Sequence, residues 1–213
     1  MRYFPINVDL QDRPCVVIGG GKVAYRKVHS LLKAGAKIRL ISPHIKEGVQ
    51  AFVDEGKITW IEREYEPGDL EGSTIVFVAV DDPAVGAVVA EEAKKLNLLI
   101  NVADIPHQCT FTLSSYIERG DLLVTISTGG KCPAYSRHMR HTLEEIVDDS
   151  YGEVLGILGQ TREEILKLGV ESDKCRDLLN NLIKENIVDL VREGKRDEAD
   201  RLAQETVARA SLK

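Results

Sequence analysis

Apolar runs alternate with helix-like segments through the first 105 residues of this 213-residue chain. Five short runs rich in β-branched residues have the character of buried strands. They are Pro14–Gly19, Lys37–Ser42, Lys57–Glu62, Thr74–Val80 and Leu98–Asp104. Helical patterns over 22–33, 44–55 and 83–96 lie between them. Strands that alternate with helices of this length predict an α/β fold with a parallel sheet and right-handed crossovers.

The pattern changes after Pro106. Residues 109–130 predict two strands, or a strand and a short helix, around a turn at 119–121. From Ala134 onward the sequence predicts helices over about 134–148, 153–168, 173–193 and 195–211. The middle segment has too little apolar surface to fold alone, so we expect it to pack on another surface, such as a second copy of the chain. We therefore expect three parts, a parallel-sheet domain over 1–106, a small α+β segment over 107–148 and a helical domain over 149–213.

Composition excludes several classes of protein. The net charge of −6 argues against a general nucleic-acid binder, and no apolar run approaches the ~20 residues that cross a bilayer. The first residues contain no apolar core of a secretory signal. Four scattered cysteines form no C-x-x-C pair, which is typical of reduced thiols and provides no metal-site spacing. We expect a cytoplasmic protein without a membrane partner, a nucleic-acid partner or a metal site.

A glycine-rich turn follows the first predicted strand. Residues 19–24 match G-x-G-x-x-A, a variant of the dinucleotide fingerprint. In this motif Gly19 permits the sharp turn, Gly21 lets the backbone approach a pyrophosphate, and Ala24 keeps the helix close to the strand. The backbone N–H groups of Lys22 and Val23 would face the cofactor. The alternative is a purely structural turn, but the position inside the first βαβ unit favours a Rossmann dinucleotide site.

One part of the fingerprint is missing at the end of the second predicted strand. An acidic residue is expected there to hold the ribose hydroxyls, whereas this chain has Ser42, Pro43 and His44. Ser42 can offer one hydroxyl contact. Alternatively, Arg39, His44 and Lys46 can face a 2′-phosphate. These residues leave NAD and NADP both open.

Three segments taken together resemble a known family. They are "YFPINVDLQDRPCVVIGGGKVAYRK", "NVADIPHQCTF" and "ISTGGKCPAYSRHMRHTLEE". Their order and spacing resemble the precorrin-2 dehydrogenases, which comprise the N-terminal module of siroheme synthases and stand-alone relatives. The resemblance implies NAD-dependent oxidation of precorrin-2 to sirohydrochlorin, with NAD rather than NADP. It also implies a homodimer formed through the segment at 107–148, which would help to form the substrate cleft.

Two alternatives to this activity stay open. In some members of the family the same site also inserts Fe²⁺ into sirohydrochlorin, which would make the chain a bifunctional dehydrogenase and ferrochelatase. The other alternative is a non-catalytic sensor of NAD or of a tetrapyrrole. Asp104 argues against the sensor, because sensing needs the nucleotide cradle but no acid.

Two strand ends provide candidate site residues, because open α/β sheets bind ligands at the carboxyl ends of their strands. Val80 and Asp81 follow the fourth predicted strand and should lie near the adenine or ribose. Asp104 follows the fifth, and it matches the acid of the family's N-V-x-D motif. Its carboxylate could accept the proton that the oxidation releases. The alternative is a loop cap, because Asp-x-Pro suits a turn. We expect Asn101, from the same motif, to make a structural contact.

A second glycine turn at 127–131 provides candidate substrate contacts. Thr128 and Gly129 could bind tetrapyrrole carboxylates or approach the nicotinamide, or form only a turn before the next helix. Lys131, Arg137 and Arg140 follow, and the eight carboxylates of precorrin-2 call for such a basic lining, although a solvated basic face is the alternative.

Further polar residues remain without a firm assignment. His138 and His141 could form an iron site, but such pairs are common by chance, and we keep His107 and Cys109 as loop residues. Arg26 and Lys27 match an Arg-Lys pair of the family motif. Their side chains could pack on the fold, form ion pairs at the surface or contact a phosphate of the cofactor.

Overall fold

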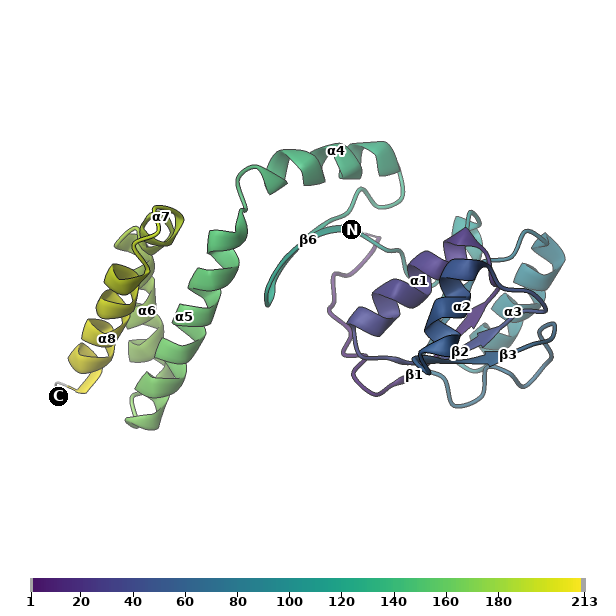
Figure 1. The fold of residues 1–213 in the computed structure, drawn as a ribbon, viewed down its shortest axis with the longest axis horizontal. Helices are drawn as coiled ribbons and strands as arrows, with labels where there is room; N and C mark the ends of the chain where they lie inside the picture. Colours follow the sequence, from purple (N-terminus) through teal and green to yellow (C-terminus); the bar gives the residue numbers. More distant parts are fainter. Residues whose placement is uncertain (1, 212–213) are drawn as a thin grey trace. The chain divides into compact units, whose positions relative to one another are not determined.

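The structure is a computed structural model that describes residues 2–211. The chain divides into two compact units, Met1–Leu113 and Ser114–Lys213 (Figure 1). The first unit contains the parallel sheet, and the second contains a hairpin and the remaining helices.

The first unit is built on five parallel strands. These are β1 (Pro14–Ile18), β2 (Lys37–Ile41), β3 (Ile58–Ile61), β4 (Ile75–Val78) and β5 (Leu99–Val102). Their order is β3-β2-β1-β4-β5, so β1 lies at the centre between β2 and β4. The order reverses direction between β1 and β4, where open α/β sheets bind ligands. The expected α/β class with a Rossmann parallel sheet is confirmed.

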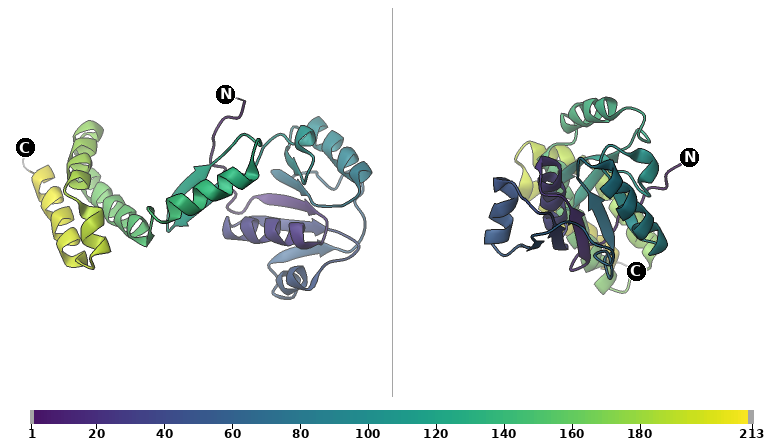
Figure 2. Two further views of the ribbon diagram at one scale, coloured as in Figure 1. Left: turned by 90° about the horizontal axis from the view of Figure 1, so that it is seen from above. Right: turned by 90° about the vertical axis from the view of Figure 1, so that its right-hand side faces the viewer.

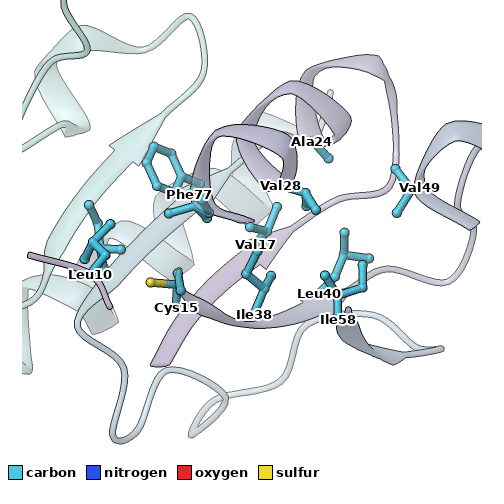
Figure 3. Packing of buried hydrophobic residues seen from close by; sticks show 13 residues of the cluster. Leu10, Cys15, Val17, Ala24, Val28, Ile38, Leu40, Val49, Ile58 and Phe77 are labelled. Atoms are coloured by element: carbon cyan, nitrogen blue, oxygen red, sulfur yellow. The ribbon is translucent and has the colours of Figure 1, made fainter. Parts of the chain in front are cut away.

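Helices cover both faces of this sheet because successive residues of each buried strand point to opposite faces. Cys15 and Val17 of β1 pack on the side of α1 (Lys22–Lys33) and α2 (Glu47–Asp54), as Figure 3 shows. Val16 and Ile18 pack on the side of α3 (Pro83–Lys95). All four side chains are at most 2% exposed, which explains the continuous apolar run in the sequence.

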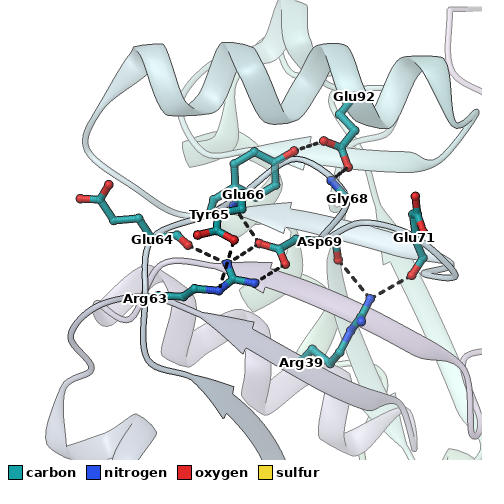
Figure 4. A network of polar contacts seen from close by, with 9 residues as sticks. All are labelled: Arg39, Arg63, Glu64, Tyr65, Glu66, Gly68, Asp69, Glu71 and Glu92. Carbon is teal, nitrogen blue, oxygen red and sulfur yellow. Dashed lines mark hydrogen bonds and ion pairs between the residues drawn. The ribbon is translucent and has the colours of Figure 1, made fainter.

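The long connection from β3 to β4 is fixed by side chains rather than by a helix (Figure 4). Arg63 binds the Asp69 carboxylate with two hydrogen bonds of 2.8 and 2.7 Å. The Tyr65 hydroxyl donates to Glu92 of α3, and the Arg39 guanidinium of β2 donates to two backbone carbonyls of the loop at 3.1 and 3.0 Å. The loop is thereby attached to β2 and to α3.

The segment after β5 folds back along this edge strand. It begins with a short 3₁₀ helix, Pro106–Gln108. The backbone N–H of Thr110 then donates to the Ile100 carbonyl at 2.9 Å, and the Thr110 hydroxyl accepts from the Ile100 N–H at 2.9 Å. These bonds occupy backbone groups that an edge strand otherwise exposes.

The second unit begins with an antiparallel hairpin of β6 (Ser115–Arg119) and β7 (Leu122–Ile126), which confirms the two-strand alternative for this segment. Helices α4 (Pro133–Glu144) and α5 (Asp149–Lys167) contact it, and Figure 2 shows α4 lying along the hairpin. A Cβ on Gly152 of α5 would lie 2.4 Å from the Arg119 carbonyl oxygen. Glycine at this position allows the helix to approach the hairpin closely.

The remaining helices are α6 (Ser172–Lys184), α7 (Ile187–Arg192) and α8 (Arg196–Ser211), and they pack with α5 around a small apolar core. The prediction of one helix over 173–193 is wrong, because the chain breaks at Asn186. This residue has φ +58°, a left-handed conformation that Asn adopts more readily than most residues. Helix α5 begins earlier than expected because the Asp148 carboxylate caps it by accepting from the Ser150 N–H at 3.1 Å.

Candidate functional site

The turn between β1 and α1 contains two glycines that close packing requires. Gly19 has φ +111°, and a Cβ there would lie 2.2 Å from the Ala79 carbonyl oxygen at the end of β4. A Cβ on Gly20 would lie 2.1 Å from the His44 carbonyl oxygen. A side chain at either position would collide with backbone. The turn is therefore held between the loops that follow β2 and β4.

Gly21 differs from both, because a Cβ there would meet no atom within 4 Å. It is the N-cap of α1 and offers no capping side chain, and the first turn of the helix contains no acid. Among the described residues, no group accepts a hydrogen bond from the backbone N–H of Gly21, Lys22 or Val23. Free N–H groups at the positive end of a helix dipole, with open space before them, fit the pyrophosphate of a dinucleotide.

The end of β2 has no acidic residue, as the sequence indicates. Ser42 is 7% exposed, and its hydroxyl donates to the His44 carbonyl oxygen at 2.7 Å, while Pro43 beside it is exposed. Ser42 Oγ can therefore only accept a hydrogen bond, which a ribose hydroxyl would have to donate. Arg39 is bound to the β3–β4 loop, which leaves His44 and Lys46 as the exposed cationic candidates near this strand end.

A hollow of about 230 Å³ lies at the carboxyl ends of β4 and β5. Four of the expected site residues line it, namely Val23, Val80, Asp81 and Asp104. Val23 comes from the first turn of α1, so the hollow adjoins the free N–H groups of Gly21, Lys22 and Val23, here called the cofactor cradle. The structure thus brings three of the expected cofactor residues and the expected catalytic acid to one hollow, whereas Ser42 and Pro43 do not line it.

Asp104 occupies the tip of a tight turn after β5. The Ile105 N–H donates to the Val102 carbonyl at 3.4 Å, and the Ala103 N–H donates to the Val78 carbonyl at 2.9 Å. Asp104 itself has φ +60° and is exposed. A residue other than glycine in this conformation stores backbone strain, and such strain often occurs at functional sites. The turn thus places an exposed carboxylate in the lining of the hollow.

The Cys109 thiol braces this turn, a role that the sequence did not suggest. Its Sγ lies 3.2 Å from both the N and the O of Val102 and 3.4 Å from the Ile105 carbonyl oxygen. The Asn101 amide donates to the Phe111 carbonyl at 3.2 Å, which is the structural contact expected for it. No spacing in the sequence distinguishes such a thiol from an ordinary loop cysteine.

The sequence also left the surroundings of Lys27 undecided between packing, surface pairing and phosphate contact. Its Nζ lies 5.5 Å from the centre of the Phe77 ring, and Phe111 packs edge-on against the same ring at 5.5 Å. The pKa of the Lys27 ammonium is lowered, chiefly by burial, while Cys109 and Asp104 raise it in part. Among the described residues, no acceptor lies within hydrogen-bond or ion-pair distance of this Nζ.

The second unit contains the other glycine turn. The Thr128 hydroxyl donates to the Cys132 carbonyl at 3.2 Å and accepts from the Cys132 N–H at 3.3 Å, so it spans the turn. Gly129 and Gly130 have φ +63° and +80°. The expected alternative of a turn before the helix and the expected ligand contacts are both compatible with this geometry.

The basic residues in α4 and just before it fall into two groups. Arg140 makes an ion pair of 2.6 Å with Glu144, whose other carboxylate oxygen lies 3.3 Å from His141 Nδ1. Lys131 and Arg137 are exposed, and neither has an acidic or carbonyl partner among the described residues. The second pair is therefore accessible to an anionic ligand.

Residues 2–211 contain no group of three or more His, Cys, Asp or Glu side chains arranged to hold a metal ion. No helix within the same range has both the length and the apolar character to cross a membrane.

Comparison with known proteins gives consistent matches. The siroheme synthase of Methylobacillus flagellatus is 38% identical over 165 residues, which cover 78% of this chain and 35% of that protein. The siroheme synthase of Pseudomonas paraeruginosa is 33% identical over 208 residues, covering 98% of this chain and 45% of that protein. The chain thus spans less than half the length of these curated relatives. The similarity confirms the resemblance that the three sequence segments indicate.

A solved structure described as "SirC, precorrin-2 dehydrogenase" matches with a TM-score of 0.80 over 97% of this chain and 100% of that chain, at 24% identity. This match confirms the fold class. Residues 6–115, which hold the sheet, the glycine cradle and Asp104, match the family model described as "Putative NAD(P)-binding". The chain belongs to this NAD(P)-binding family.

Proposed function

We propose that this chain oxidises precorrin-2 to sirohydrochlorin with NAD as the hydride acceptor. The observation that carries the proposal is the hollow that places Val23, from the cofactor cradle, beside Asp104. The names of the relatives, siroheme synthase and precorrin-2 dehydrogenase, support this substrate.

The cradle would hold the dinucleotide through its backbone. Gly19 allows the turn, and the N–H groups of Gly21, Lys22 and Val23 would bind the pyrophosphate. Ser42 and Pro43 would lie by the adenosine, and Val80 and Asp81, which line the hollow, would lie near the adenine or ribose. When bound, NAD supplies the nicotinamide ring that accepts a hydride. The capture of Arg39 by backbone carbonyls supports NAD over NADP.

Asp104 would take the proton. The oxidation removes two electrons and two hydrogens from the macrocycle, one hydrogen as a hydride to the cofactor and the other as a proton. A carboxylate oxygen of Asp104 accepts that proton and stabilises the positive charge that develops as the hydride leaves. The braced turn fixes the backbone that carries this carboxylate before the substrate arrives, which lowers the entropic cost of reaching the reactive arrangement.

The second unit would contribute contacts to the substrate. Thr128, Gly129, Lys131, Arg137 and Arg140 provide a hydroxyl, a glycine turn and three cations for the carboxylates of precorrin-2. Lys131 and Arg137 support this role best, because neither has a partner in the described chain.

The proposal includes a cytoplasmic homodimer with a sheet domain over 1–106, a dimerisation and substrate-cleft segment over 107–148 and a helical domain over 149–213. One face of the hairpin exposes Tyr116 and Leu123, which are 42% and 47% exposed. Apolar side chains on a hairpin face support a contact with a second copy of the chain.

The test is an absorbance assay of purified protein with precorrin-2 and NAD. We expect NADH and sirohydrochlorin to form in equal amounts. Asp104→Asn should lower kcat by roughly 10²- to 10⁴-fold, because general acid–base catalysis contributes about that much. Asn adopts a positive φ as readily as Asp does, so the turn should persist. The affinity for NAD should stay within about twofold.

Asp82→Asn is the matched control. It also removes a carboxylate from the lining of the hollow, but the Asn side chain can still cap α3, where Asp82 accepts from the Ala84 N–H at 2.8 Å. We expect at most a few-fold loss of activity. Absence of NADH formation by the unaltered protein would overturn the proposed reaction, and undiminished turnover by Asp104→Asn would overturn the role of Asp104.

A further inference from the structure

Lys27 lies on the face of α1 that is directed toward the proposed site. It follows Val23 by four residues, so the two side chains share a helix face, and Val23 lines the hollow. Side chains of a helix lean toward its N-terminus, which for α1 is the end at the carboxyl edge of the sheet. The Lys27 side chain therefore leans toward the end of α1 that adjoins the hollow, although it is not itself part of the lining.

The Lys27 ammonium has no hydrogen-bond acceptor and no ion-pair partner among the described residues. The side chain is half-buried, and its Nζ faces the Phe77 ring without an acceptor in hydrogen-bond range. Withdrawing a charge from water without a partner is unfavourable, and a cation–π contact compensates only in part. A packed Met or Leu would fill this position without that penalty. The position therefore keeps a charged group for which the fold alone gives no reason.

The surroundings of Lys27 connect it to the Asp104 turn. Phe111 packs against Phe77, and the Phe111 carbonyl accepts from Asn101. The Asn101 amide also lies 3.7 Å from the Cys109 sulfur that braces the turn. In agreement with these contacts, Asp104 attracts the Lys27 charge and raises its pKa against the effect of burial.

We propose that Lys27 binds a carboxylate of the tetrapyrrole substrate beside Asp104. This inference rests on the proposed function and names a substrate contact for it. The hollow itself contributes the carboxylates Asp81, Asp82 and Asp104, which repel a substrate with eight carboxylates unless a cation lies nearby. The free N–H groups of residues 21–23, one helical turn before Lys27, would bind the cofactor phosphates. The Lys27 ammonium is therefore available to bind the substrate.

Three variants test the assignment. Lys27→Met removes the charge and keeps an unbranched side chain over Phe77, and Lys27→Arg keeps the charge. Arg26→Met removes the neighbouring cation on an exposed part of the same helix and is the matched control. The measurements are the KM for precorrin-2, the KM for NAD, the Kd of sirohydrochlorin by calorimetry, and the Tm.

For Lys27→Met we expect the KM for precorrin-2 and the Kd of sirohydrochlorin to rise at least about tenfold, the effect of losing one charge-assisted hydrogen bond. The KM for NAD should change less than about twofold, and Lys27→Arg should recover most of the affinity. The Tm of Lys27→Met should stay equal or rise, because no charge is then withdrawn from water. Arg26→Met should leave all four quantities nearly unchanged.

Three outcomes overturn the inference. The first is that Lys27→Met weakens the affinity for NAD and leaves the Kd of sirohydrochlorin unchanged. The second is that Lys27→Met and Arg26→Met have equal effects on the four quantities. The third is that Lys27→Met lowers the Tm and leaves the Kd of sirohydrochlorin unchanged. If the unaltered protein forms no NADH, the proposed reaction fails, while the calorimetric comparison still decides whether Lys27 binds the tetrapyrrole.

Discussion

The two glycine turns of this chain use glycine for different physical reasons. At residues 19–20 a side chain would enter neighbouring backbone, with contacts of 2.2 and 2.1 Å. At Gly130 a side chain would meet nothing within 4 Å, and what favours glycine there is φ +80°. The first turn is held between two other loops of the sheet, whereas the second is closed by Thr128 and Cys132 of its own loop.

The difference shows what each turn can position. The first turn is part of the packing of its unit, so it fixes the free N–H groups of α1 relative to the hollow. The second is a local loop that depends on dihedral angles and one hydroxyl, so a ligand there would be held by groups of the loop itself. Three glycine substitutions separate these effects.

Gly19→Ala should have the largest effect. A Cβ there both opposes φ +111° and collides with the Ala79 carbonyl. We expect a loss of unfolding free energy of about 3 kcal/mol or more, the sum of backbone strain and overpacking. Urea denaturation of the whole chain measures it. A loss below about 1 kcal/mol would mean that the turn is not held as described.

Gly21→Ala should act on cofactor binding and not on stability. Gly21 has φ −85°, which alanine adopts without strain, and open space surrounds it. We expect the Kd of NAD to rise about tenfold, because a methyl group would occupy the space through which a pyrophosphate approaches the backbone. Fluorescence titration with NADH and a thermal melt give the two readouts. Unchanged affinity would argue against a pyrophosphate at this position.

Gly130→Ala should have the smallest effect, about 1 kcal/mol of unfolding free energy, from the left-handed conformation alone. Gly130→Asn is the control. It should lose less unfolding free energy than Gly130→Ala, because Asn adopts a positive φ more readily than Ala does. The loss should appear in the melting of the second unit. A loss as large as that of Gly19→Ala would remove the distinction between the two turns.

The fold followed from the sequence where periodicity was strong. Helix α1 has the bounds that the pattern predicts, and the five apolar runs form the five parallel strands in the first unit. The single helix predicted over 173–193 was wrong because the apolar spacing continues through Asn186, where the backbone takes a left-handed conformation. A pattern of hydrophobic residues does not contain dihedral angles, so such a break is visible only in the structure.

The candidate site was predictable only in part, for a similar reason. Strand ends and the glycine fingerprint located Val23, Asp81 and Asp104, because strand-end position follows from the sheet topology. The roles of Cys109 and Lys27 depend on how the segment after β5 folds back over the sheet. That path is a tertiary property, and no local spacing reports it.

The loop between β3 and β4 makes the folding of the first unit more cooperative. Its anchors come from β2 through Arg39 and from α3 through Glu92, which belong to the two halves of the chain that flank the central strand. The loop can acquire these bonds only when both halves are already assembled. Each half therefore stabilises the loop on which the other also depends, and loss of either half removes one set of these bonds.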